Sequence, residues 1–266
     1  MNKPATIDFA TAAAILVPAA TAPTQALHDL VPGEARDSLL AVHDVLRREL
    51  PQGPLAIYEA GGGSCSVLPP ELPGRSKVTV VDIDEDQVRN NTYADEAILG
   101  DVQTYRFGHE TFDLVICYNV IEHLPHVDAA LLNFRDALKR GGMILIGAPN
   151  PRSLSGVVTK YSPHWFHVWF YRHIRGIKDA GQPGEPPFPT FFHPLVTLPR
   201  LEAFAAANGL DMIYCREVES PRYPEMRRRK PLVAALVDAG AAALNAVFPR
   251  GTDVRRGDYH VILRKS

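Results

Sequence analysis

The chain has 266 residues, of which 46% are hydrophobic and 22% charged, enough apolar material for one large domain with a sizeable core. A formal net charge of -2 argues against nucleic acid as a partner, because proteins that bind it carry a strongly basic domain or face. The three cysteines are widely spaced and lack CxxC spacing, so they favour a reducing, cytoplasmic setting over a disulfide framework or a zinc site.

After an N-terminal segment (residues 1–33), the chain alternates between helical and strand patterns up to residue 150. Apolar side chains recur at helical spacing over residues 34–50. Four short apolar runs predict buried strands: residues 55–60, 77–84, 112–120 and 143–149. Such alternation is typical of βαβ units, so we expect residues 34–150 to form a Rossmann-like α/β core with a doubly wound parallel sheet.

Two further helices are expected inside this core. One is a short helical segment that follows the glycines at 61–63. The other covers residues 128–140, with Asp128 as its N-cap and Gly141-Gly142 at its end.

The rest of the chain, residues 151–266, contains a proline-rich insertion and a C-terminal part. Residues 151–200 hold eight prolines and a dense aromatic run at 160–176, which indicates an insertion or lid over the ligand-binding end of the sheet. Residues 201–266 are expected to complete the same domain with helices and a hairpin of two strands, residues 210–219 and 258–265.

The sequence "IYEAGGGSCS" puts an acid and three glycines directly after the first strand. Glycines at this position allow a tight turn and let a ligand approach the backbone N–H groups closely. Asp82 ends the next strand, where a carboxylate can accept hydrogen bonds from both hydroxyls of a ribose. The pattern therefore predicts a nucleotide-like cofactor, and this much fits NAD and S-adenosylmethionine equally.

Three residues distinguish between the two cofactors. The dinucleotide fingerprint G-x-G-x-x-G would need glycine where Ser66 stands. Glu59 is unfavourable beside a pyrophosphate but suits a cofactor that carries an ammonium and a sulfonium. Asp101 follows the expected third strand and can accept a hydrogen bond from an adenine amino group. These residues favour S-adenosylmethionine.

Taken together, these motifs resemble those of the class I S-adenosylmethionine-dependent methyltransferases. The matching stretches are "EAGGGSC", "VVDID", "GDV", "FDLVICYNVIEHL" and "LKRGGMILIGAPN". Cys65 stands at the family's third glycine. The resemblance implies a seven-stranded sheet whose last strand is antiparallel. It implies a cofactor pocket formed by Glu59, Gly61, Gly63, Asp82, Ile83, Asp101, Val102 and Asn119, in which Ile83 and Val102 flank the adenine.

His123 follows the fourth strand, at the sheet edge where cofactor and acceptor should meet. Its ordinary pKa near 6.5 suits a general base for an acceptor that carries a proton, and the alternative is a histidine whose ring only bonds backbone. The surrounding stretch is similar to the ubiquinone-pathway O-methyltransferases, in which a Glu-x-x-Glu-His pattern is associated with a divalent metal. Glu122 and His123 match that pattern, but Asn119 stands in place of its first glutamate. One missing carboxylate weakens a site for a hard cation, so metal dependence is left open and no metal ligand is assigned.

The aromatic run provides the candidate acceptor-binding residues Tyr161, His164 and Trp165. A lid with these side chains would enclose a flat or apolar acceptor, whereas a packed helix with an aromatic stripe would place them in the core. Its histidines show no pattern of four tetrahedral zinc ligands.

Residues 227–248 combine "RRRK" with an apolar helix. This pattern is typical of an interfacial helix that touches a membrane, which a lipid-like acceptor would explain. The mostly alanine polar side of the helix fits equally well with packing on the domain or at a homodimer interface.

The leading hypothesis is a methyltransferase that transfers a methyl group from S-adenosylmethionine to a small-molecule or lipid-like acceptor. A non-catalytic protein of the same fold, binding a partner through the aromatic run and the C-terminal helix, is the alternative. A nicotinamide-dependent reductase is disfavoured by Ser66, and nucleic-acid methylation by "YNVIEHL" where an Asn/Asp-Pro-Pro-Tyr/Phe loop would be needed.

Overall fold

A computed structural model of the protein describes residues 14–15, 33–63, 66–173, 176–182, 187–220, 222–247 and 255–266. Most of the N-terminal segment (residues 1–33) lies outside these residues, as does Cys65, the residue expected in place of the third glycine.

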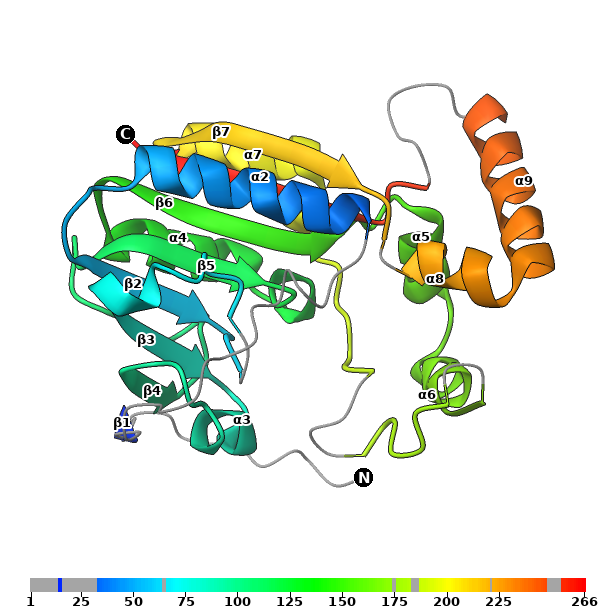
Figure 1. Ribbon diagram of the computed structural model, residues 1–266, viewed down its shortest axis with the longest axis horizontal. Coiled ribbons are helices and arrows are strands. Elements are labelled where there is room, and N and C mark those ends of the chain that lie inside the picture. The colour runs from blue at the N-terminus through cyan, green and yellow to red at the C-terminus, as the bar shows by residue number, and fades with distance from the viewer. Residues whose placement is uncertain are drawn as a thin grey trace.

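The described strands form one sheet in the order β1-β4-β3-β2-β5-β6-β8-β7 (Figure 1). Their bounds are β1 Ala14–Ile15, β2 Leu55–Ala60, β3 Ser76–Asp82, β4 Glu96–Leu99, β5 Phe112–Tyr118, β6 Leu138–Pro149, β7 Leu210–Val218 and β8 Asp258–Lys265. Strands β2 to β6 run parallel, and β8 is antiparallel to its neighbours β6 and β7. The predicted seven-stranded Rossmann-like sheet with an antiparallel last strand is confirmed, and the two-residue β1 adds an antiparallel edge next to β4.

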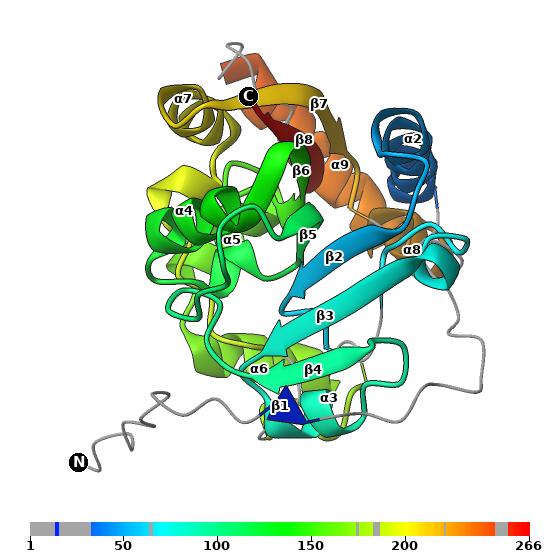
Figure 2. The same cartoon turned by 90° about the vertical axis from the view of Figure 1, so that its left-hand side faces the viewer.

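Helices cover both faces of this sheet (Figure 2). The α-helices are α2 Glu34–Glu49, α3 Glu85–Arg89, α4 Val127–Ala137, α5 Leu154–Tyr161, α6 His164–His173, α7 Leu198–Ala207, α8 Arg222–Arg229 and α9 Pro231–Val247. Short 3-10 helices are η1 Pro73–Arg75, η2 Ile121–His123 and η3 Pro194–Val196. Helix α2 packs on one face, and α4 and α7 pack on the other.

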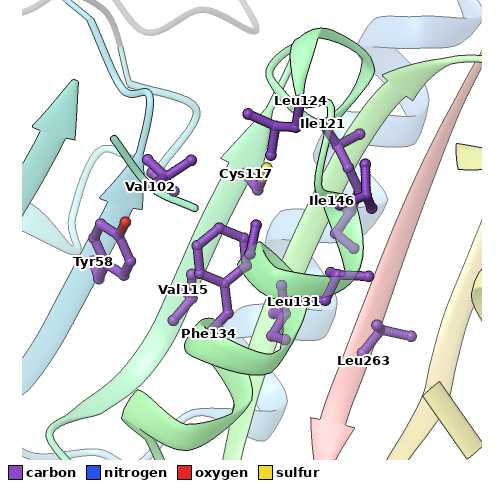
Figure 3. Close-up of a cluster of buried hydrophobic side chains, with 14 of the residues drawn as sticks. Tyr58, Val102, Val115, Cys117, Ile121, Leu124, Leu131, Phe134, Ile146 and Leu263 are labelled. Atoms are coloured by element: carbon purple, nitrogen blue, oxygen red, sulfur yellow. The ribbon is translucent and has the colours of Figure 1, made fainter. Parts of the chain in front are cut away.

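Alternating side chains of the strands build a core on each face, as expected for strands that are buried on both sides. In β2, Ile57 contacts the cluster that contains Val42 of α2, whereas Tyr58 contacts the cluster on the other face. Tyr58 lies edge-to-face with Phe134 of α4 at 5.7 Å between ring centroids. Figure 3 shows this second cluster, in which side chains of β5, α4 and η2 gather on one face of the sheet.

The prediction of a helix after the glycines is wrong. Between Gly61 and β3, the described residues form turns and the single 3-10 turn η1. Prolines at 69, 70 and 73 explain the difference, because proline lacks a backbone N–H and clashes inside a helix. The buried side chains of Val67, Leu68 and Leu72 fill the place on the α2 face that a helix would cover.

The helix expected over residues 128–140 also ends differently. Helix α4 begins at Val127, after His126 at the N-cap, so Asp128 lies in the first turn and is not the cap. At Leu138 the chain enters β6, where Leu138 pairs with Phe112. Gly141 has a φ of 74° at an irregularity in the pairing of β6 with β5, so the glycines form a bulge inside the strand.

The predicted insertion follows β6, the fifth strand of the core. Helices α5 and α6 lie beyond the carboxyl ends of the parallel strands, on the side toward which the arrowheads of β2, β3 and β5 point (Figure 1). The domain boundaries at 33/34, 150/151 and 200/201 stay predictions.

Candidate cofactor and acceptor site

The glycine loop turns sharply at the carboxyl end of β2. Gly61 has a φ of 67°, and its backbone N–H donates to the Val81 carbonyl at 2.7 Å, which ties the loop to the end of β3. A Cβ at this position would lie 2.5 Å from Cγ2 of Val120. Both the backbone conformation and the contact therefore require glycine here.

Asp82 holds the other end of the loop. Its Oδ2 accepts a hydrogen bond from the Gly63 N–H at 3.0 Å, and its Oδ1 accepts one from the Asp84 N–H at 2.9 Å. Burial raises the pKa of this carboxyl group, and the two N–H donors act in the opposite direction. Each oxygen has a second lone pair, so the predicted bonds from ribose hydroxyls can still form.

A ring of buried polar side chains supports the loop, and sequence reasoning missed most of it. Asn91 is fully buried, and its Nδ2 donates to the Gly63 carbonyl at 2.6 Å. Tyr93 donates from its hydroxyl to Oε2 of Glu59 at 2.9 Å, and Ser66 donates to the other oxygen of Glu59. Asn91 and Tyr93 belong to no sequence motif that could have revealed these contacts.

Glu59 lies underneath the loop and is 2% exposed. Burial raises its pKa to about 7, although its hydrogen bonds with Ser66 and Tyr93 lower it. Because both carboxylate oxygens already accept bonds from the protein, Glu59 holds the loop in shape. Its predicted contact with the cofactor would have to use the remaining lone pairs.

Asp101 sits two residues after β4, next along the same edge. Its carboxylate accepts bonds from the Gln103 backbone N–H at 2.8 Å and from Gln103 Nε2 at 3.0 Å. Gln103 also accepts a bond from the His126 N–H through Oε1, so it links Asp101 to the start of α4. Of the two residues expected to flank an adenine, Ile83 is 63% exposed at the edge, whereas Val102 is buried in the core cluster of Figure 3.

Asn119 provides the turn at the end of β5. It is exposed and has a φ of 55°, a left-handed conformation that asparagine tolerates better than most residues. Its backbone N–H donates to the Gly147 carbonyl at 2.8 Å. This turn places Val120 against Gly61, so β5 and the glycine loop meet at the same edge.

His123 lies on η2, beside the tail of the insertion. Its Nδ1 is 2.7 Å from the Pro189 carbonyl oxygen, and its ring packs edge-to-face with Phe188. A carbonyl can only accept, so Nδ1 carries the proton and the neutral ring keeps a lone pair on Nε2. Burial lowers the pKa of His123, which favours this neutral form.

The segment from Phe188 to Phe192 is held over η2. The backbone N–H groups of Phe191 and Phe192 donate to the Glu122 carbonyl at 3.0 and 3.3 Å. Phe188 and Phe191 are 47% and 59% exposed, so apolar surface lies beside the His123 ring. No sequence motif could reveal this contact, because Pro189 is distant from His123 along the chain.

The predicted acceptor-binding residues lie on the insertion helices and are exposed. Tyr161 ends α5, and His164 and Trp165 begin α6. The side chains of Tyr161 and Trp165 are 77% and 69% exposed, so the interpretation as a packed core helix does not hold for them. Their contact with an acceptor stays a prediction.

Within the described residues, no group of three or more histidine, cysteine or acidic side chains is placed to hold a metal ion.

Comparison with known proteins agrees with this fold. Residues 58–144 match a family model described as a methyltransferase domain. The phosphoethanolamine N-methyltransferase 2 of Haemonchus contortus, solved with S-adenosyl-L-methionine, aligns with a TM-score of 0.52 at 16% identity, over 86% of this chain and 52% of that one. A Listeria monocytogenes protein assigned as an S-adenosylmethionine-dependent methyltransferase aligns with a TM-score of 0.54 at 12% identity, over 86% and 99% of the two chains. No curated protein matches the sequence.

The fold and the matched domain define the class. Residues 58–144 carry a methyltransferase domain on the Rossmann-like fold of S-adenosylmethionine-dependent methyltransferases, so S-adenosylmethionine is the methyl donor expected here. The residues present fit that cofactor, since the half-exposed glycines lie beside the carboxylates of Asp82 and Asp101 along one edge. The narrower similarity to ubiquinone-pathway O-methyltransferases stays a prediction.

Proposed function

We propose that the enzyme methylates a small-molecule or lipid-like acceptor that binds between the glycine loop and the segment 187–193. The observation that carries the proposal is the position of His123. It lies on the turn directly after β5, with a proton on Nδ1, a lone pair on Nε2 and the exposed ring of Phe188 beside it.

S-adenosylmethionine supplies a methyl group made electrophilic by its sulfonium. Asp82 and Asp101 bind the ribose and the adenine amino group in this proposal, and Gly61 and Gly63 keep the backbone clear of side chains. The acceptor is held in line with the methyl group, so the protein contributes mainly by orientation. His123 takes the acceptor's proton at Nε2 when the acceptor carries one.

The proposed choice of acceptor rests on the apolar side chains near His123 and on the insertion. Phe188, Phe191, Tyr161 and Trp165 are exposed and would find a favourable contact in an apolar or aromatic acceptor. The phosphoethanolamine N-methyltransferase among the structural relatives acts on a small molecule, as its name states. A homodimer and a non-catalytic role stay alternative proposals, and the second would require a damaged cofactor edge, whereas both acids and both glycines are present.

The cofactor part is tested by calorimetric titration with S-adenosylmethionine, S-adenosylhomocysteine and NADH. We expect the two adenosyl ligands to bind and NADH not to bind. Asp82→Ala should weaken S-adenosylmethionine binding by about a hundredfold, because two hydrogen bonds to a charged group are lost. Asp86→Ala, in the first turn of α3, is the matched control, and equal affinities of the two variants would contradict the assignment of Asp82.

A further inference from the structure

Helix α9 exposes large apolar side chains near its beginning, whereas two of its alanines are buried. Leu232 and Leu236 are 81% and 75% exposed, and Val233 is 47% exposed, whereas Ala234 and Ala241 are 3% and 1% exposed. The three exposed residues lie on one side of the helix, because positions three and four apart are neighbours. A surface helix in water normally shows the reverse arrangement, so this face fits an apolar partner.

Basic side chains stand at the beginning of that face. Arg228, Arg229 and Lys230 are exposed directly before α9. Arg227 has a different role, because it bridges Glu219 at 2.7 Å and Asp238 at 3.1 Å and so fixes α9 against the end of β7. Asp238 is the single acid in α9, which leaves positive charge at the edge of the apolar face.

A second exposed apolar surface lies on α6. Trp165 and Trp169 are 69% and 45% exposed, and they share one side of the helix because they are four residues apart. In Figure 1, α6 and α9 both lie beyond the carboxyl ends of the parallel strands, and in Figure 2 both lie behind the sheet. The two helices therefore lie at the same edge of the molecule, the edge that holds the proposed site.

We propose that the exposed side of α9, the basic residues 228–230 and the aromatic side of α6 form one docking surface for an anionic phospholipid bilayer. A bilayer surface matches both features, since phosphates lie at the level of the basic side chains and hydrocarbon lies below them. Tryptophan is also favoured at the boundary between the two layers. Docking in this orientation turns the carboxyl edge of the sheet toward the bilayer, and it deepens the proposed function by naming the source of a lipid-like acceptor.

None of the helices within the described residues is both long and apolar enough to cross a bilayer, so the contact proposed is with the bilayer surface. A second copy of the chain is the competing occupant of this face. It is disfavoured because a contact between two copies would bring the exposed basic residues of both toward one apolar interface.

Sedimentation with vesicles tests the apolar contact. The full chain should bind vesicles that contain phosphatidylcholine and phosphatidylglycerol, and bind pure phosphatidylcholine vesicles much more weakly. Leu232→Ser/Leu236→Ser should weaken binding to the mixed vesicles by about tenfold or more, because two leucines no longer enter the hydrocarbon. Leu40→Ser, at an exposed position of α2, should bind like the wild type.

A charge variant tests the anionic partner. Arg228→Gln/Lys230→Gln should lose about fivefold in affinity per charge removed. Arg48→Gln/Lys77→Gln is the matched control, because it removes two exposed basic residues near the amino ends of the strands. Equal loss in both variants would show attraction by overall charge and would overturn the proposed surface.

Tryptophan fluorescence tests the orientation. The chain has two tryptophans, and both lie on α6. Their emission should shift to the blue when mixed vesicles are added, and lipids brominated in the chain should quench it. Binding to vesicles with unchanged emission would confine the contact to α9 and overturn the placement of the sheet edge toward the bilayer.

The competing occupant and the proposed function are distinguished in the same series. If the wild type is a dimer that Leu232→Ser/Leu236→Ser separates, and no vesicles are bound, the face is an interface between copies and the bilayer proposal is overturned. Vesicle binding is measured without S-adenosylmethionine, and Asp82→Ala should bind vesicles like the wild type. A failed cofactor titration and a failed vesicle experiment therefore contradict different proposals.

Discussion

The glycine-loop edge and the part of the molecule formed by α6 and α9 differ in the surroundings of their side chains. At the glycine loop, polar side chains such as Asn91, Glu59 and Asp82 are almost fully buried, and each bonds the loop or its support. On α6 and α9, large apolar side chains such as Trp165 and Leu232 are exposed. The first region is fixed before any ligand arrives, whereas the second offers surface that only a partner can cover.

Changes at four positions test these two regions, and the largest effect is expected at His123, which contacts the segment 187–193. His123→Ala should lower turnover by about a hundredfold or more while the affinity for S-adenosylmethionine stays unchanged, because the variant loses the proton acceptor only. His126→Gln, at an exposed neighbouring position, is the control. Turnover of His123→Ala at the wild-type rate would make His123 a structural residue.

The pH dependence of turnover checks the same residue. His123 accepts a proton only when it is neutral, and burial lowers its pKa below the ordinary value of 6.5. Wild-type turnover should therefore persist at neutral pH and fall as the pH drops through this lowered pKa. This fall should disappear from the residual activity of His123→Ala.

Glu59→Gln tests the buried support of the loop. Burial raises the pKa of Glu59 from its ordinary value of 4.5 to about 7, so between these values the folded protein holds a proton that the unfolded chain has released. This group therefore destabilises the fold as the pH rises through that window, by about 3 kcal/mol. Chemical denaturation on both sides of the window should show a flatter pH dependence for Glu59→Gln than for the wild type.

Other buried groups also change their protonation between about pH 4 and 7. The test is therefore the difference in pH dependence between Glu59→Gln and the wild type. His260 has a pKa lowered to about 4 by burial, and it contributes stability that rises with pH up to its unfolded pKa. Glu85→Gln, in the exposed first turn of α3, should keep the wild-type pH dependence. An equal pH dependence for Glu59→Gln and the wild type would contradict the raised pKa of Glu59.

Gly61→Ala tests the steric requirement of the loop. The positive φ and the short approach to Val120 should destabilise the protein by about 1 to 2 kcal/mol and weaken cofactor binding. Gly74→Ala is the control, because no atom lies within 4 Å of a Cβ there. If thermal unfolding shows equal stability for the two variants, the glycine is not required by the loop conformation.

Trp165→Ala should have the smallest effect on the fold. Its side chain is exposed, so the free energy of unfolding should change by less than about 0.5 kcal/mol. If Trp165 contacts the acceptor, its loss should raise the KM for the acceptor and leave the affinity for S-adenosylmethionine unchanged. A large loss of stability would instead place α6 in the packed core.

Much of the fold could be predicted because local patterns dominate it. The strands of the sheet are continuous apolar runs, and the order of the motifs around Gly61, Asp82 and Asp101 indicated the class of enzyme. The prediction of a helix after the glycines failed because the prolines at 69, 70 and 73 disfavour an α-helix there. The end of α4 was misplaced because Leu138 pairs with β5, a tertiary contact that helical periodicity does not reveal.

The sequence by itself determined the sheet, the acids along its edge and the histidine after β5, since each follows from residue type and spacing within one segment. Tertiary structure decided what these groups contact. Asn91 reaches Gly63, Gln103 binds Asp101 and Pro189 fixes the proton on His123 only after the chain has folded. The same holds for α9, where the packing of Ala234 and Ala241 selects which side of an apolar helix stays exposed. Such contacts join residues whose spacing along the chain follows no helix or strand period. They can therefore be recognised only in the folded structure.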